Sequence, residues 1–115
     1  MRRRKARLDS LLREVIGEVI RDRVADPRVS SFLTITEVDV SPDLRRARVG
    51  VSILGSQEER EVTLRTLQNM SKFVGTEAAR LVTLRYFPSL QFFSDRRIEE
   101  AARLEELLRQ ANYTG

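Results

Sequence analysis

Residues 40–51 read Val-Ser-Pro-Asp-Leu-Arg-Arg-Ala-Arg-Val-Gly-Val, which predicts the end of one strand, a proline turn and the start of a second strand. Side chains on a strand alternate between its two faces. One face of the second strand would carry Ala47, Val49, Val51 and Ile53, and the other would carry Arg46, Arg48, Gly50 and Ser52. We expect the apolar set to face a core and the arginines to lie on a rigid, solvated surface. Such a surface suits a polyanionic partner, although arginine is also an ordinary solubilising residue.

The composition excludes most catalytic classes. A chain of 115 residues is long enough for one domain that buries about two-thirds of its unfolded surface. It has no cysteine and no histidine, which excludes disulfides, thiolate or imidazole metal sites, thiol nucleophiles and imidazole-based catalysis. We therefore expect no cofactor and no metal. No apolar stretch is long enough for a membrane span or a secretory signal, so we expect a soluble, cytoplasmic protein. We also expect the protein to be monomeric when free.

The positive charge is concentrated at the start of the chain. The net charge is +4, yet residues 8–115 carry 16 basic against 17 acidic residues. The surplus comes from Arg2, Arg3, Arg4, Lys5 and Arg7. Because residues 1–7 have little apolar content, they are expected to be a disordered basic arm that attracts phosphate, followed by a folded domain over 8–111 and a frayed tail over 112–115. The alternative is a solvated terminus that binds nothing specific.

The first third of the chain predicts a core helix. Apolar residues recur there at helical spacing: Leu8, Leu11, Leu12, Val15, Ile16, Val19, Ile20 and Val24. The helix should end near Ala25, because Asp26 precedes Pro27 and is disfavoured in helical conformation.

The next segments predict a hairpin and a capped second helix. The apolar parity of the strand over 33–41 changes near Thr36 and Glu37, which a β-bulge would explain. Ser41-Pro42-Asp43 suits a tight turn. After the second strand, Ser56 and Glu59 form a capping box that begins a helix.

Gly75 and Thr76 interrupt the apolar stripe of this second helix, and they predict a kink or break. A new helix start exposes unpaired N–H groups, and glycine allows a sugar-phosphate backbone to approach closely. Close packing against the first helix is the alternative explanation for Gly75. The helical run should end at Tyr86-Phe87-Pro88 and be followed by a short strand over 90–93. A last helix is capped by Ser94 or Asp95, with an apolar stripe of Ile98, Ala101, Ala102, Leu104, Leu107 and Leu108.

The predicted order is helix, strand, strand, helix, helix, strand, helix, which is the type II KH arrangement with a broken central helix. The local sequence resembles the ribosome-binding factor A family. The matching pieces are the basic start leading into R-x-D-S-L-L-R-E-V-I, the D-P-R of 26–28, the T-x-V-x-V-S-P-D-L-x-x-A-x-V segment of 36–49, and Leu84-Arg85 through Pro88 to F-F-S-D at 92–95.

The resemblance implies an α+β fold with one type II KH-like domain, a three-stranded mixed sheet with helices on one face, and a C-terminal helix. It also implies binding to the maturing small ribosomal subunit and its ribosomal RNA, help in late ribosomal RNA processing, and often support of growth in the cold. No catalytic activity is known in the family, and no membrane partner is expected. The family's Ala-x-Gly kink falls on Met70-Ser71-Lys72, where the glycine is missing. Either the kink has moved to Gly75, or the helix is straighter and Lys72 contacts phosphate by charge alone.

Residues expected to contact RNA, mostly at phosphate and sugar, lie in three groups. The groups are Arg2, Arg3, Arg4, Lys5 and Arg7 in the arm; Arg45, Arg46 and Arg48 at the hairpin; and Ser71, Lys72, Gly75, Thr76, Arg80 and Arg85 around the expected break. The aromatic residues Tyr86, Phe87, Phe92 and Phe93 could stack bases, but core packing is the stronger expectation.

Two other functions compete with this interpretation. The charge pattern alone would equally suit a generic KH-like module acting on messenger RNA or DNA. An enzyme is the weakest hypothesis, because Glu58, Glu59 and Asp95 have no nucleophile, metal-ligand set or phosphate loop beside them and are explained by helix surfaces and caps.

Overall fold

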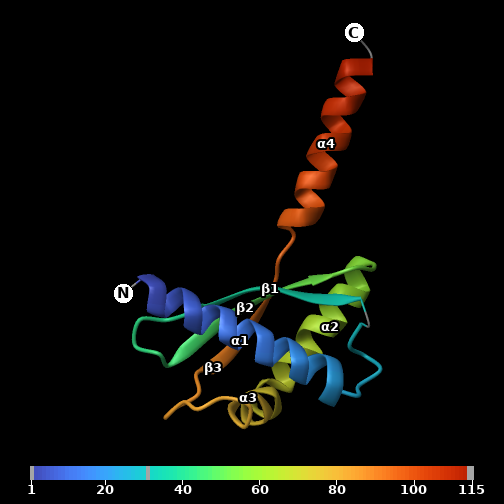
Figure 1. The fold of residues 1–115 in the computed structure, drawn as a ribbon. Helices are drawn as coiled ribbons and strands as arrows, with labels where there is room; N and C mark the ends of the chain where they lie inside the picture. Colours follow the sequence, from blue (N-terminus) through green and yellow to red (C-terminus); the bar gives the residue numbers. More distant parts are fainter. Residues whose placement is uncertain (1, 31, 114–115) are drawn as a thin grey trace.

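The computed structural model describes residues 2–30 and 32–113, with Arg2 and Tyr113 described by their backbone alone. The elements follow the predicted order (Figure 1). They are α1 (Arg2–Arg23), β1 (Leu33–Val40), β2 (Arg46–Ile53), α2 (Gln57–Asn69), α3 (Ser71–Ala79), β3 (Ser89–Ser94) and α4 (Arg97–Tyr113). No helix in the described ranges combines the length and apolar character that crossing a membrane requires.

The sheet is mixed, as predicted. Its order is β1-β2-β3, with β1 antiparallel to β2 and β3 parallel to β2. The register shifts between Ile35 and Glu37, which confirms the predicted bulge. Gly50 lies opposite this bulge, and a Cβ atom there would come within 2.7 Å of Thr36 Oγ1 and 2.9 Å of Phe93 Cζ. Glycine is therefore required at position 50 by the close approach of two side chains.

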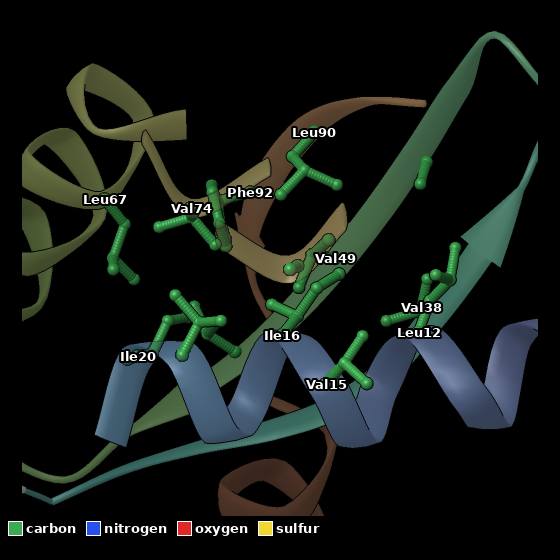
Figure 2. Close-up of a cluster of buried hydrophobic side chains, with 14 of the residues drawn as sticks. Leu12, Val15, Ile16, Ile20, Val38, Val49, Leu67, Val74, Leu90 and Phe92 are labelled. Carbon is green, nitrogen blue, oxygen red and sulfur yellow. The ribbon is translucent and has the colours of Figure 1, made fainter. Parts of the chain in front are cut away.

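The core lies between the sheet and the helices α1, α2 and α3 (Figure 2). Ala47, Val49, Val51 and Ile53 are all buried, which confirms the predicted inner face of β2. Leu12, Ile16 and Val19 of α1 are fully buried against it, together with Leu67 of α2 and Val74 of α3. Each large apolar side chain buried in this way contributes about 1.5–3 kcal/mol before entropy is counted.

The N-terminal segment differs from the prediction because residues 2–7 are the first turns of α1 and not a disordered arm. Two contacts explain this order. The ammonium group of Lys5 donates to the carboxylates of Asp9, one turn further along the helix, and of Asp39 on β1. Asp9 in turn accepts a hydrogen bond from the backbone N–H of Val40 at 3.0 Å, so the basic end of α1 is attached to the end of β1.

The helix break also lies elsewhere than predicted. The break expected at Gly75 and Thr76 is wrong, because both residues lie inside α3. The chain instead leaves helical geometry at Met70, with φ −95° and ψ 8°, at the Met70-Ser71-Lys72 position that the resemblance had indicated. The bend lets Leu67 before it and Val74 after it both reach the core. The helix then ends at Ala79, earlier than expected, in a tight turn in which Leu81 N donates to Ala78 O.

The last helix projects away from the rest of the molecule (Figure 1). Its predicted apolar stripe is present, but Leu104, Leu107 and Leu108 are each more than half exposed. Asn112 and Tyr113 continue α4, so fraying does not begin at 112; residues 114–115 lie outside the described ranges. The start of the helix is held by buried Asp95, which accepts from Thr36 Oγ1 at 2.7 Å and from Arg97 Nη2 at 2.6 Å.

Candidate nucleic-acid interface

A groove of about 770 Å³ runs between α3 and β3. We call it the α3–β3 groove. It is lined by five of the residues predicted from the sequence, which are Ser71, Lys72, Gly75, Thr76 and Arg80. Across from them it is lined by Pro88, Ser89, Leu90 and Gln91 at the start of β3. The structure therefore gathers most of the third predicted group into one concave surface.

The start of α3 lies at this groove. Its first α-helical bond is donated by Val74 to Met70 O at 2.9 Å, so the N–H groups of the first turn are not used by the helix itself. No side chain caps this end, and exposed Lys72 stands in the first turn. Unused N–H groups beside a lysine are suited to an anionic group such as phosphate.

Gly75 faces the groove and not α1. A Cβ atom built on Gly75 would meet only the Phe87 ring, with Cδ1 at 3.8 Å, which is an ordinary contact. Close packing against the first helix therefore does not explain this glycine. Its helical backbone has no positive φ, so no turn requires it either.

The one acidic side chain in this region is neutralised within the protein. Glu77 is paired with Arg23 of α1 at 2.6 Å and lies 3.7 Å from Arg80. In the described part of the chain, Lys72 and Arg85 have no acidic partner. The predicted local excess of positive charge is thus present around the groove.

The second predicted group, the arginines of the hairpin, lies next to the same groove. Ser89 lines the groove, pairs in register with Arg46 and donates its N–H to Arg45 O at 2.9 Å. The turn before them is held by Asp43, which accepts from Ser41 Oγ and from Arg45 N. These hydrogen bonds lower the pKa of Asp43 below its ordinary value, and the bond from Ser41 has the largest effect.

Arg48 lies further along the open face of the sheet, which the helices do not cover. Its guanidinium stacks over the Phe93 ring, 4.5 Å from the centroid. Arg45, Arg46 and Arg48 form no ion pair with any described residue. The neighbouring acids on β1 are already paired, Asp39 with Lys5 and Glu37 with Arg97, so these arginines are available to an outside anion.

The first predicted group, at the start of α1, lies beside the turn between β1 and β2 (Figure 1). Arg3, Arg4 and Arg7 are exposed. Lys5 is less available, because its hydrogen bonds to Asp39 and Asp9 hold it in place and raise its pKa. Of Arg2 only the backbone, inside α1, is described.

The aromatic residues divide between core and surface. Phe92 is buried and Phe87 is half-buried, as core packing predicted. Tyr86 is 75% exposed, with Arg85 stacked 5.5 Å from its ring centroid, and Phe93 lies on the open face of the sheet.

Gln68 is one of several groove residues that were not predicted. It lines the groove from the end of α2. Neither spacing nor charge distinguishes this glutamine from other polar helix residues, so the sequence alone carries no signal that would have found it.

Comparison with known proteins agrees with this arrangement. Residues 4–108 match the sequence profile of the ribosome-binding factor A family. The chain belongs to the ribosome-binding factor A family. It is 44% identical over 105 residues to ribosome-binding factor A of Protochlamydia amoebophila, covering 91% of this chain and 80% of that protein.

Two structures of Thermus thermophilus family members show the same fold. The crystal structure of ribosome-binding factor A from this organism superposes with a TM-score of 0.68 at 30% identity, over 78% of this chain and 94% of the other. The second is a homology model of the T. thermophilus ribosome binding factor A fitted into a cryo-EM map of a complex with the 30S subunit. It has a TM-score of 0.62 at 28% identity and covers 76% of this chain and 90% of the other. The family membership confirms the resemblance seen in the sequence.

Proposed function

We propose that this chain is an RNA-binding assembly factor that associates in the cytoplasm with the maturing small ribosomal subunit and assists late processing of its ribosomal RNA. The observation that carries the proposal is the α3–β3 groove in a chain of this family. Lys72 lines it, and so does Ser89, which pairs in register with Arg46 and bonds to Arg45 O. The relative fitted into the 30S complex supports the small subunit as the partner.

The mechanism is attraction of the RNA backbone to a preformed surface. Phosphates would lie at the first turn of α3 and along the turn between β1 and β2, and the exposed arginines of α1 would extend the contact. Each contact releases counterions from the RNA, so the affinity falls as salt is raised. No covalent bond is made or broken, and Glu58, Glu59 and Asp95 keep structural roles.

We assign phosphate contacts to the basic residues of 1–7 and to the domain over 8–111 that carries the groove. Sedimentation of cell lysate on a density gradient tests the proposal. We expect the protein to travel with small-subunit particles at low salt and to leave them as salt rises. Finding the protein only at the top of the gradient at low ionic strength would contradict the proposal.

Variants distinguish the contribution of the arginines at the start of α1 from that of the α3–β3 groove. The triple variant Arg3→Ala, Arg4→Ala, Arg7→Ala removes the exposed arginines of α1 while keeping Lys5 and its ion pairs. Lys72→Ala removes the lysine in the groove. Arg13→Ala is the matched control, because Arg13 lines the hollow between α1 and β1 at the other edge of the sheet. We expect weaker particle association for the first two variants and unchanged association for the control.

A generic module for messenger RNA or DNA is the second candidate, because a cationic groove alone would serve either nucleic acid. Crosslinking in cells followed by sequencing of the bound nucleic acid distinguishes the two. The assembly factor should be enriched in small-subunit ribosomal RNA, whereas the generic module should show no such enrichment.

A further inference from the structure

The side chain of Gln68 makes two hydrogen bonds to the backbone of β3. Its Nε2 donates to Leu90 O at 3.3 Å, and its Oε1 accepts from Phe92 N at 2.9 Å. Gln68 is the second-last residue of α2 and directly precedes the Asn69–Met70 break. The amide therefore lies against the strand at the point where the helix bends.

These two backbone groups lie on the free edge of the sheet. Ser89 N donates to Arg45 O, and Asp95 N donates to Val51 O, so the odd-numbered residues of β3 face β2. Backbone groups alternate in direction along a strand, so Leu90 and Phe92 face outward. A free strand edge offers donors and acceptors to any extended or planar polar group that reaches it.

The same edge forms one wall of the α3–β3 groove, since Gln68, Leu90 and Gln91 all line it. An unpaired nucleotide held in such a groove presents the donors and acceptors of its base edge side by side. The Gln68 amide also presents one donor and one acceptor side by side. It therefore occupies the two backbone groups that a base would otherwise use.

We propose that Gln68 determines specificity by covering the edge of β3, so that the groove holds the sugar-phosphate backbone of RNA without reading its bases. This inference rests on the proposed RNA-binding function. The cations at the groove attract any single strand equally, because phosphate contacts carry no sequence information. Removing the amide would leave Leu90 O and Phe92 N free to bond with a base.

The experiment measures the affinity of the full chain for four short single-stranded RNA homopolymers by fluorescence anisotropy. Wild type should bind all four with affinities within about threefold of each other, since phosphate contacts alone do not discriminate. Gln68→Ala should widen the range to about tenfold or more, because a bidentate contact to a base edge discriminates on this scale.

Two control variants test the cause. Gln68→Met keeps a side chain of similar length in front of the strand edge but offers no amide, so it should block base access and leave the affinities as uniform as in wild type. Gln57→Ala removes an exposed amide at the other end of α2, outside the groove, and should also leave them uniform. The proposal would be overturned if either control showed a wider range of affinities among the four RNAs than wild type. It would also be overturned if folded Gln68→Ala showed no wider range.

A measurement on wild type keeps the proposal testable if Gln68→Ala does not fold. During titration with RNA, NMR should show the backbone amide of Lys72 shifting while the amide of Phe92 keeps its position. A shift of the Phe92 amide that differs among the four RNAs would mean that a base displaces Gln68, contrary to the proposal. Absence of binding to all four RNAs by wild type would instead contradict the proposed function.

Discussion

At the scale of single residues, Gly75 is a helix-interior glycine that packing does not require. Alanine is favoured over glycine inside a helix by about 0.5–1 kcal/mol, and a Cβ atom there would make only an ordinary contact with Phe87. Gly75→Ala should therefore raise the free energy of unfolding by about that amount, measured by urea denaturation. Gly50→Ala is the opposite control, because its Cβ atom would clash with Thr36 and Phe93. A less stable Gly75→Ala protein would contradict the continuous helix seen across position 75.

Asp95 is a buried residue whose ionisation links stability to pH. It accepts hydrogen bonds from the side chain of Arg97, from Thr36 Oγ1 and from Arg97 N. The hydrogen bond from the Arg97 side chain has the largest effect, and together these contacts hold the pKa of Asp95 well below its ordinary value of 3.8. Because the folded pKa is lowered, this stabilisation is fully present above the ordinary pKa and is lost as the pH falls towards the folded value.

The variant Asp95→Asn tests this linkage. At neutral pH it should unfold more easily than wild type, and the difference should shrink as the pH is lowered below about 4. Denaturation curves over a series of acidic pH values measure the difference directly. A difference that stays constant down to the most acidic pH would show that Asp95 stabilises the fold through its shape and not its charge.

At the scale of elements, α4 is independent of the core. Leu104 and Leu108 are 57% and 56% exposed, whereas Leu67 of α2 is fully buried. Leu104→Ala and Leu108→Ala should each change the free energy of unfolding by less than about 0.5 kcal/mol. Leu67→Ala should cost about 2–5 kcal/mol because it leaves a cavity.

Amide hydrogen exchange gives a second measurement of the same claim. An isolated helix of the length of α4 is marginally stable in water, so its amides should exchange much faster than those of α1. Exchange as slow in α4 as in α1 would show that the last helix is covered in solution.

The elements also show what sequence patterns can and cannot predict. The β1 bulge, the turn at Ser41, the capping box of Ser56 with Glu59 and the inner face of β2 follow from local rules and are confirmed. No residue type at Met70 predicts the break there, because the break depends on how two helices reach one core. Gly75 favoured the wrong position, and only the family resemblance indicated 70–72. The order of residues 2–7 depends on the contact of Lys5 with Asp39, more than thirty residues away. The role of Gln68 depends on the position of β3, which spacing along the chain does not reveal.

At the scale of the whole molecule, the cations gather where three elements meet. The start of α1 is attached to the end of β1, the turn after β1 leads into Arg45 and Arg46, and Ser89 joins this turn to the α3–β3 groove. Two of the acids nearby are paired internally, Glu77 with Arg23 and Asp39 with Lys5, and Asp43 accepts hydrogen bonds within the turn. A chain of modest net charge thereby places cations at the end of the sheet where β1 ends and β2 and β3 begin, while α4 carries acids and arginines together.

The salt dependence of binding to purified small-subunit ribosomal RNA tests this account most directly. The logarithm of the affinity should fall linearly with the logarithm of the salt concentration, and Lys72→Ala should reduce the slope by about 0.7–1, the amount expected for one lost phosphate contact. Arg13→Ala, at the other edge of the sheet, should leave the slope unchanged. An affinity that does not depend on salt, or equal slopes for wild type and Lys72→Ala, would contradict the claim that the groove binds RNA through its phosphates.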